Sequence, residues 1–474
     1  MAHEFLLNIQ DLMNQNREEE AYSLLKSRVH EFREDFFFFY LKGSLETILG
    51  DYATACESFK QSIAINPHEA QTYSDLGYLY FLRQMPKESQ IFLERALAIA
   101  PGDIGVLERL GMLHCWQGKP AEARKYLEAL VALNQTAHSA WYYLAEIEAA
   151  EGHWERATRY YAEARKSKDF RREALFGMAR SLEHQSRFRE AVEEYESLIQ
   201  EEEDLESLAR ILARIGFCHM RDGRLHQSRR AFERALQIKK DSKVIYGNLG
   251  ALSLELGDLE QARFYLMEGL ALGEDPELLI QLGVCQLRLS DAVKAEISLK
   301  RAMGVADEEQ AVRVHYLLGK AYLAQGRYEL ARACFLKIIS DEHVDVDCLL
   351  LYLEASEHTR HLDEDLRDLR KHSGNELASF HATVLFLLSR HRQEEALLYA
   401  KQGTDTFPED SHLWFYKAST LAVLNQHEKA LWALEISIGL EPAMAARAKN
   451  NPCFAGLRKS DQFLDLVNIS GRGW

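Results

Sequence analysis

The sequence predicts an all-α protein built as a solenoid of antiparallel helix hairpins. Small residues and prolines recur at a spacing of about 34 residues along most of the 474-residue chain, and apolar residues between them follow helical spacing. A fixed period of this length is typical of repeat proteins, in which each unit packs only on its neighbours. The chain is also too long for one ordinary core, which favours an array over a single globular domain.

The prolines place the helix boundaries. Six of the eight prolines form three pairs at a separation of 34 residues: Pro67 with Pro101, Pro86 with Pro120, and Pro408 with Pro442. A proline is tolerated in the first turn of a helix, because the N–H that it lacks has no partner there. We therefore expect Pro86, Pro120 and Pro276 to begin helices. The other two pairs are expected to end helices: each of Pro67, Pro101, Pro408 and Pro442 follows the second helix of its own unit.

Small residues mark each unit at three places. The first series is Gly43, Gly77, Gly111, Gly216, Gly250, Gly283 and Gly319. The second is Gly50, Gly118, Gly152, Gly223, Gly257 and Gly326. The third is alanine or serine, as at Ala55, Ser89, Ala123, Ala157 and Ala191. The first and third series are expected where two helices approach closely. The second falls seven residues after the first and suits a left-handed residue just past a helix end.

The repeated unit resembles the tetratricopeptide repeat. Residues 70–103 carry its residue types in order, at Tyr73, Leu76, Gly77, Tyr80, Ser89, Ala96 and Pro101. Eleven units in phase begin at residues 36, 70, 104, 138, 172, 209, 243, 276, 312, 377 and 411. The resemblance covers nearly the whole chain, and it implies a right-handed superhelical array with an extended concave surface.

The units divide the chain into five expected segments. These are a capping hairpin at 1–35, nine units at 36–344, a degenerate repeat or hinge at 345–376, two units at 377–444, and a C-terminal cap at 445–474. The segment at 345–376 loses the Leu-Gly and alanine signals, so it is either a divergent repeat, or a hinge or boundary between two arrays. Three extra residues in "QEEEDLES" are expected to form a solvated loop. The ending resembles the closing segment of many bacterial repeat proteins and is expected to cover the last apolar face.

The run "FFFFY" at residues 36–40 cannot point one way, because five consecutive residues go right round a helix. We expect Phe39 inside its own hairpin, and Phe36 and Phe38 facing back under the N-terminal hairpin. Phe37 and Tyr40 are then expected to face the concave groove.

Composition argues against several classes of function. With 57 basic and 73 acidic side chains the net charge is −16, which disfavours a nucleic-acid partner or an anionic membrane surface. No apolar run is long enough to span a bilayer, and the N-terminus lacks the pattern of a signal peptide. Seven cysteines without paired spacing are typical of reduced thiols, so a cytoplasmic location is expected.

No motif of an enzyme or cofactor site is found. The sequence has no glycine-rich phosphate loop, no HExxH and no GxSxG. His219 and His226 lie on different helices with no further ligand at metal spacing. We therefore expect no catalytic residue, no metal and no cofactor.

The resemblance implies that the first helix of each unit lines the concave groove. Matching the family positions residue by residue predicts these aromatic partner-binding residues: Phe37, Tyr40, Tyr78, Phe81, Trp116, Tyr142 and Phe176. Aromatic residues at helical spacing are often core, as we expect for Tyr73, Trp141 and Phe59. Exposed aromatic clusters, by contrast, are typical of binding hot spots.

The predicted function is a protein-interaction scaffold or adaptor that binds a peptide or a helical segment of a partner along this groove. A clamp for chaperone tails is disfavoured, because the matching positions are Tyr40, Ser44, Ser74 and Tyr78, and Asn248 stands alone. Two alternatives stay open. One is a scaffold that self-associates into a homo-oligomer. The other is a helical repeat that binds RNA, which the acidic composition disfavours.

Overall fold

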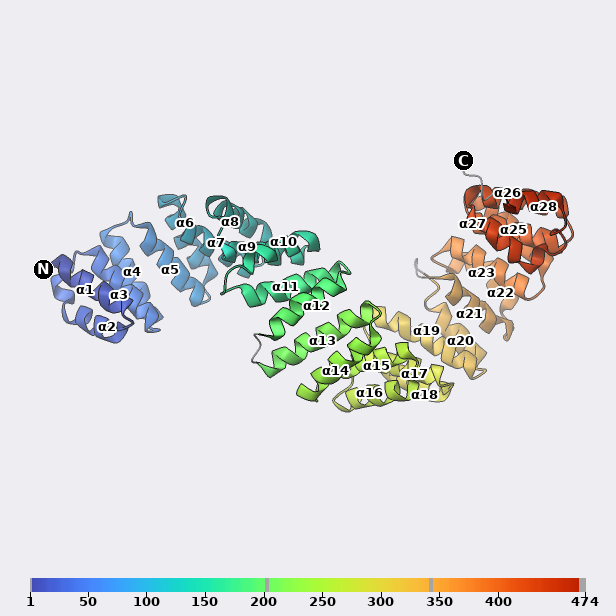
Figure 1. Cartoon of the computed structure of the whole chain (residues 1–474), viewed down its shortest axis with the longest axis horizontal. Coiled ribbons are helices and arrows are strands. Elements are labelled where there is room, and N and C mark those ends of the chain that lie inside the picture. Colours follow the sequence, from blue (N-terminus) through green and yellow to red (C-terminus); the bar gives the residue numbers. More distant parts are fainter. Residues whose placement is uncertain (1, 201–203, 341–343, 469–474) are drawn as a thin grey trace. The chain divides into compact units, whose positions relative to one another are not determined.

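The chain forms two compact units of stacked helix hairpins, Met1–Lys239 and Lys240–Trp474 (Figure 1). A computed structural model describes residues 2–200, 204–340 and 344–468. Within those ranges the secondary structure is helical and no strand occurs, which confirms the all-α prediction. The loop expected at 201–203 and the end of the cap at 469–474 lie outside the described residues.

In both compact units each hairpin has an odd-numbered "first helix" that packs antiparallel against the even-numbered "second helix" after it. The helices of the first unit are α1 (Ala2–Asn14), α2 (Glu18–Ser27), α3 (Phe36–Ile48), α4 (Tyr52–Ile65), α5 (Ala70–Leu82), α6 (Pro86–Ile99), α7 (Ile104–Trp116), α8 (Pro120–Leu133), α9 (His138–Ala150), α10 (Trp154–Ala164), α11 (Arg171–His184), α12 (Phe188–Ile199), α13 (Leu205–Arg221) and α14 (Leu225–Ile238), with a 3-10 turn at Val29–Glu31.

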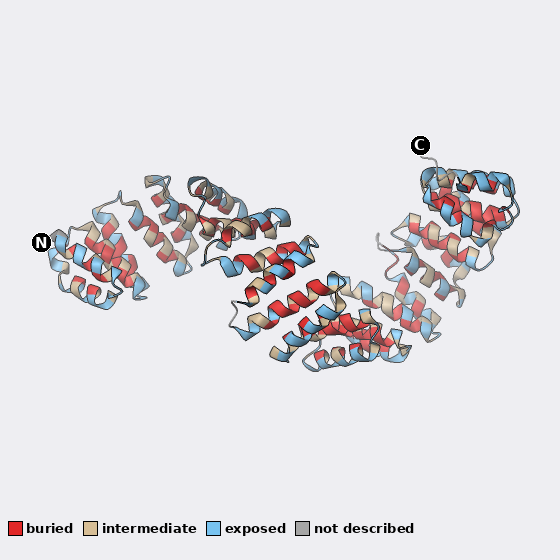
Figure 2. Cartoon of the chain, in the orientation of Figure 1, coloured by how far each residue is buried: buried red, intermediate tan, exposed pale blue. Residues whose placement is uncertain are grey.

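The second unit repeats this arrangement and ends in short helices. Its helices are α15 (Lys243–Leu256), α16 (Leu259–Ala271), α17 (Pro276–Arg288), α18 (Ala292–Met303), α19 (Glu308–Ala324), α20 (Tyr328–Leu336), α21 (Val346–Glu357), α22 (Leu362–His372), α23 (Glu376–Ser389), α24 (Gln393–Thr406), α25 (Ser411–Val423), α26 (His427–Leu440), α27 (Ala443–Asn450) and α28 (Asp461–Asn468), with a 3-10 turn at Pro452–Phe454. As predicted, prolines begin α6, α8 and α17. In both units the buried residues gather where helices pack together (Figure 2).

A left-handed residue follows the first helix of most hairpins. All six glycines of the second series have positive φ, between 68° and 81°, which confirms the prediction. The structure adds residues without that signal that adopt the same conformation at the equivalent place: Asn16, Gln84, Ser186, Ser290, His391 and Asn425. The repeated turn is thus kept where glycine is lost, at the cost of an uncommon conformation for these side chains.

The first glycine series lies where the two helices of a hairpin meet. A β-carbon at Gly43 would stand 2.9 Å from the ring of Phe59, and one at Gly77 would stand 2.7 Å from Cγ of Leu93. The partner lies 16 residues later in both cases, so the contact repeats with the period. These distances are shorter than real carbon contacts, which confirms that close packing requires small residues here.

The N-terminal run "FFFFY" is only partly as expected. Phe38 is fully buried and stacks on Phe32 at 5.0 Å between ring centroids, and Phe32 stacks on Phe5 at 5.3 Å. The N-terminal hairpin therefore covers Phe38, as predicted. The expectation for Phe36 is wrong, because Phe36 is half-buried outside this cluster.

Phe39 also differs from the expectation. It is buried with the side chains of the N-terminal hairpin and Phe38, and not inside its own hairpin. The physical reason is that the ring of Phe59 lies over Gly43 and fills the interior of the α3–α4 hairpin.

The C-terminal helices cover the last hairpin. Phe454 is fully buried and meets the ring of Phe415 on α25 at 5.6 Å, and Phe463 packs on Phe454 at 5.8 Å. Residues 345–376 contain the hairpin of α21 and α22. The hinge or boundary expected at this hairpin stays a prediction.

Candidate functional site

In each hairpin stack most consecutive first helices pack directly against one another. In the first unit α3 meets α5, α5 meets α7, α7 meets α9 and α9 meets α11 directly, whereas consecutive second helices of that unit make no comparable contacts among the described residues. Helices that approach more closely on one side of a stack put that side on the inside of its curve. We call this surface the first-helix face, and all seven predicted partner-binding residues lie on helices that form it.

Phe37 and Tyr40 begin this face on α3. Asp35 accepts hydrogen bonds from the backbone N–H groups of the first turn and fixes the start of the helix. The two rings stack at 6.0 Å, and both side chains are half-buried. Burial and the carboxylate of Asp75 on α5 raise the pKa of Tyr40 to about 12. Tyr40 therefore stays a neutral phenol at physiological pH.

Arg109 on α7 ties the next two first helices together. Its Nη1 donates to Oγ of Ser74 and to Oδ1 of Asp75, each at 2.7 Å. Its guanidinium also lies 5.0 Å from the ring centroid of Tyr78. Arg109, which is not among the predicted partner-binding residues, orders the polar floor between the aromatic residues.

Tyr78, Phe81 and Trp116 form a row of touching rings. Tyr78 stacks on Phe81 with 6.2 Å between centroids, and Phe81 meets Trp116 edge to face at 6.0 Å. Trp116 is 55 % exposed, while the other two are half-buried. An indole that is this exposed yet held by a neighbouring ring offers a large apolar surface with little freedom to lose on binding.

Tyr142 and Phe176 lie further along the first-helix face and share a hollow of about 370 Å³. Tyr142 stacks on Phe170 at 5.4 Å, and burial together with the carboxylates of Glu146 and Glu173 raises its pKa to about 12. Phe176 packs against Tyr195 at 5.8 Å. The structure shows no ring contact between this pair and Trp116 among the described residues, so the predicted residues form separate clusters.

A larger hollow of about 810 Å³ opens between α11 and α13, a pair of first helices that does not meet as closely as those before it. We call it the arginine hollow. It is lined by Phe176, Arg180, Glu183, His184, Ser186, Phe188, Arg210, Arg214, Phe217 and Arg221. Matching the family positions placed Phe176 on this face but did not point to the arginines of α13. Their spacing on α13 was the available signal.

A buried ion pair forms the floor of the arginine hollow. Glu183 is 7 % exposed and pairs with the guanidinium of Arg214, whose Nε donates to Oε1 at 3.1 Å. The thiol of Cys218 donates to the same oxygen at 3.5 Å. Burial and the nearby Glu183 raise the pKa of Cys218 well above its usual range. This thiol is therefore a packing group and not a nucleophile.

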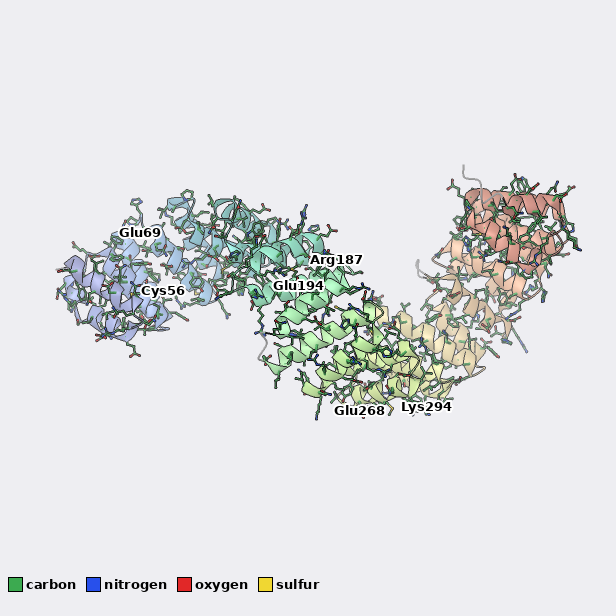
Figure 3. All side chains as sticks on the ribbon, viewed as in Figure 1. Cys56, Glu69, Arg187, Glu194, Glu268 and Lys294 are labelled. Atoms are coloured by element: carbon green, nitrogen blue, oxygen red, sulfur yellow. The ribbon has the colours of Figure 1, made fainter. Side chains whose placement is uncertain are left out.

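A third hollow, of about 840 Å³, lies mainly between the second helices α16 and α18. Phe264, Met267 and Ile297 line it with exposed fractions of 58 %, 56 % and 57 %. Glu268 and Lys294, which Figure 3 labels, belong to its rim. This surface lies on second helices, outside the predicted groove.

One group of three potential metal ligands is found in the described part of the chain, Glu148, Glu151 and His153. Arg124 makes ion pairs with both glutamates, at 3.0 Å and 2.8 Å. A guanidinium already neutralises these carboxylates, which disfavours a cation. None of the helices in the described ranges has the length and apolar character of a membrane span.

Comparisons with known proteins agree with the repeat architecture. Family models described as "Tetratricopeptide repeat" match residues 38–69, 209–242 and 244–275, residues 109–164 and 148–204, and residues 312–341. The comparison with curated proteins gives no match.

Parts of the chain are similar to solved structures. YrrB, described as a TPR protein with an unusual peptide-binding site, is 19% identical over 37% of this chain and 91% of its own, with a TM-score of 0.33. MamA is 20% identical over 35% and 92%, with a TM-score of 0.33. PilW, a type IV pilus biogenesis factor, is 18% identical over 42% and 92%, with a TM-score of 0.39. The periodic turns, the close glycine contacts and the matching family models together show that this chain is a tetratricopeptide repeat protein.

Proposed function

We propose that this protein is an adaptor that binds a segment of a partner protein along the first-helix face of its first unit. Tetratricopeptide repeat arrays present extended surfaces for protein partners, and the described residues suggest where such a partner docks. The observation that carries the proposal is the row of Tyr78, Phe81 and Trp116, in which the ring of Phe81 holds an exposed indole and is itself stacked on Tyr78. Rigid aromatic anchors of this kind supply most of the binding energy in many interfaces.

The polar floor beside the row also suits a polypeptide. Ser74, Asp75 and the guanidinium of Arg109 lie next to the rings of Tyr40 and Tyr78. A peptide backbone carries both donors and acceptors, so it can pair with such a mixed floor while its side chains contact the rings. The binding mode we favour is an extended or helical segment laid across α3, α5 and α7.

The test is capture of a partner by the intact protein, followed by mass spectrometry and by a measured dissociation constant for the purified pair. The same capture is run with a variant that carries Tyr78→Ala, Phe81→Ala and Trp116→Ala. A control variant carries Ile91→Ala and Leu133→Ala, which remove exposed apolar groups from the second helices α6 and α8. A partner that is lost with the first variant and kept with the second supports the proposal. A partner that binds both variants equally contradicts it.

Self-association is the second candidate function. The hollow on α16 and α18 favours it, because three large apolar side chains there are more than half exposed, and Arg263 and Lys294 beside them are already in ion pairs. Exposed apolar patches often mark interfaces. Sedimentation of wild type and of a Phe264→Ser variant over a range of protein concentrations separates the two functions. A dimer that dissociates in the variant supports self-association, whereas a monomer at all concentrations removes it.

A further inference from the structure

The α13 side of the arginine hollow carries a regular row of cations. Arg210, Arg214 and Arg221 are separated by four and seven residues, with Phe217 between them, so all four side chains lie on one face of the helix. Arg180 on α11 lines the same hollow from the opposite side. Four guanidinium groups and one carboxylate, that of Glu183, therefore line one hollow of a protein whose net charge is −16.

Most of these guanidinium groups have no carboxylate partner. Arg214 is neutralised by Glu183, but the structure gives Arg180, Arg210 and Arg221 no ion pair with any carboxylate of the described residues. Such a concentration of positive charge repels itself, so a bound anion stabilises it.

Aromatic rings hold two of these cations in place. The guanidinium of Arg210 lies 5.4 Å from the ring centroid of Phe176. That of Arg221 lies 5.6 Å from Phe188 and 5.9 Å from Phe217. Cation–π contacts of this kind orient a guanidinium while leaving its N–H groups free to donate. The rings also offer apolar surface beside the charges.

We propose that the arginine hollow binds an acidic segment of a partner protein, with separate carboxylates on Arg180, Arg210 and Arg221. The inference rests on the proposed adaptor function and adds the chemistry of the partner. An apolar side chain of the same segment packs against Phe176 or Phe217. The adjoining smaller hollow contains Glu146 and Glu173, so the acidic part of the segment extends away from it, towards Arg221.

The spacing of the cations favours a polypeptide over a single phosphate. From residue 210 to residue 221 the helix rises by about 16 Å, so the guanidinium groups do not converge on one point. Carboxylates on successive side chains of a peptide match such a line, and each guanidinium can hold one of them with two hydrogen bonds. A nucleic acid needs a longer basic surface than one hollow in an acidic protein.

The experiment measures the affinity of the full chain for a fluorescent synthetic peptide of glutamate and phenylalanine, and for the same peptide with glutamine in place of glutamate. We expect the wild type to bind the acidic peptide at least tenfold more tightly, with an affinity that falls as salt rises. A variant with Arg180→Gln, Arg210→Gln and Arg221→Gln should lose at least tenfold.

A matched variant controls for net charge. It carries Arg95→Gln, Arg159→Gln and Arg234→Gln, three exposed arginines on the second helices α6, α10 and α14, and it should bind as the wild type does. Circular dichroism and melting curves show whether each variant is folded. If the first variant unfolds, Arg180→Gln alone, at an exposed position, should still weaken binding about threefold.

Three outcomes overturn the inference. In the first outcome the wild type binds neither peptide, and in the second it binds both peptides equally. In the third the control variant loses as much affinity as the variant with Arg180→Gln, Arg210→Gln and Arg221→Gln. A fourth outcome is that a single-stranded oligonucleotide binds more tightly than the acidic peptide. It would show that the hollow binds a nucleic acid and not a protein. In another outcome the capture of a partner requires Tyr78, Phe81 and Trp116 but not the arginines of the hollow. That result would support the adaptor function and contradict binding of an acidic segment in the hollow.

Discussion

The ring of Phe81 meets the ring of Trp116 edge to face with 6.0 Å between centroids, although the two residues belong to consecutive hairpins. The contact exists because α5 and α7 approach directly on the first-helix face. It leaves more than half of the indole exposed. The first-helix face, which the repeat forms, therefore carries an ordered aromatic anchor.

Truncating this aromatic row should weaken partner binding without unfolding the protein. Hot-spot truncations cost about 2 kcal/mol or more each, so Tyr78→Ala, Phe81→Ala and Trp116→Ala together should reduce affinity at least tenfold. Isothermal titration with the captured partner measures the loss, and a melting curve checks the fold. Phe81 is half-buried, so a large drop in melting temperature would show that the row is core and not a binding surface.

The close glycine contacts predict a sharp difference between two Gly→Ala substitutions. At Gly77 the new β-carbon would stand 2.7 Å from Cγ of Leu93 and 3.1 Å from its backbone nitrogen. Overpacking of this kind costs about 1–3 kcal/mol. At Gly102 no heavy atom lies within 4 Å of the added carbon, so the change should stay within about 0.5 kcal/mol. Urea denaturation measures both, and equal effects would contradict the packing argument.

The N-terminal hairpin should be essential for the first unit. Deleting residues 1–33 removes the rings of Phe5 and Phe32 from Phe38, which is fully buried. Uncovering such a phenylalanine forfeits about 1.5–3 kcal/mol and exposes an apolar end, so aggregation is expected. By contrast, Phe37→Ser with Tyr40→Ser should leave a folded protein with impaired binding. A sizing column and a melting curve compare them, and a stable monomer after the deletion would mean that α3 needs no cover.

Stability of the second unit should depend on pH through Glu296. Burial raises the pKa of this carboxyl, but hydrogen bonds from Lys300, Gln325 and Arg327 outweigh it and lower the pKa to about 2. A depressed carboxyl pKa stabilises the fold above the unfolded-state value, near 4.5. That stability is lost as pH falls from about 4.5 towards 2.

The Glu296→Gln variant isolates this effect. It should be about 1–3 kcal/mol less stable than the wild type near neutral pH, since one of the cations is more than half exposed and partly screened. The difference should shrink below pH 4.5. Denaturation in urea at a series of pH values measures it, and a difference that is constant down to pH 2 would show that the charge of Glu296 contributes nothing.

Features that repeat with the period could be predicted from the sequence. The left-handed residue at Gly50 and the contact of Gly43 with Phe59 depend on the geometry of one hairpin, which each unit repeats. Phe36 and Phe39 were assigned less well, because their surroundings depend on how the N-terminal hairpin packs. The arginine hollow could not be predicted, since α11 and α13 meet less closely than the first helices before them. No local pattern gives that distance.

The central claim is that a partner protein docks on the first-helix face. A photoreactive phenylalanine analogue in place of Trp116 tests it most directly, with Ile91 on α6, which is 63 % exposed, replaced in a second sample as the control. We expect illumination to cross-link the captured partner from position 116 and not from position 91. Cross-linking from position 91 alone would place the partner on the second helices and contradict the claim.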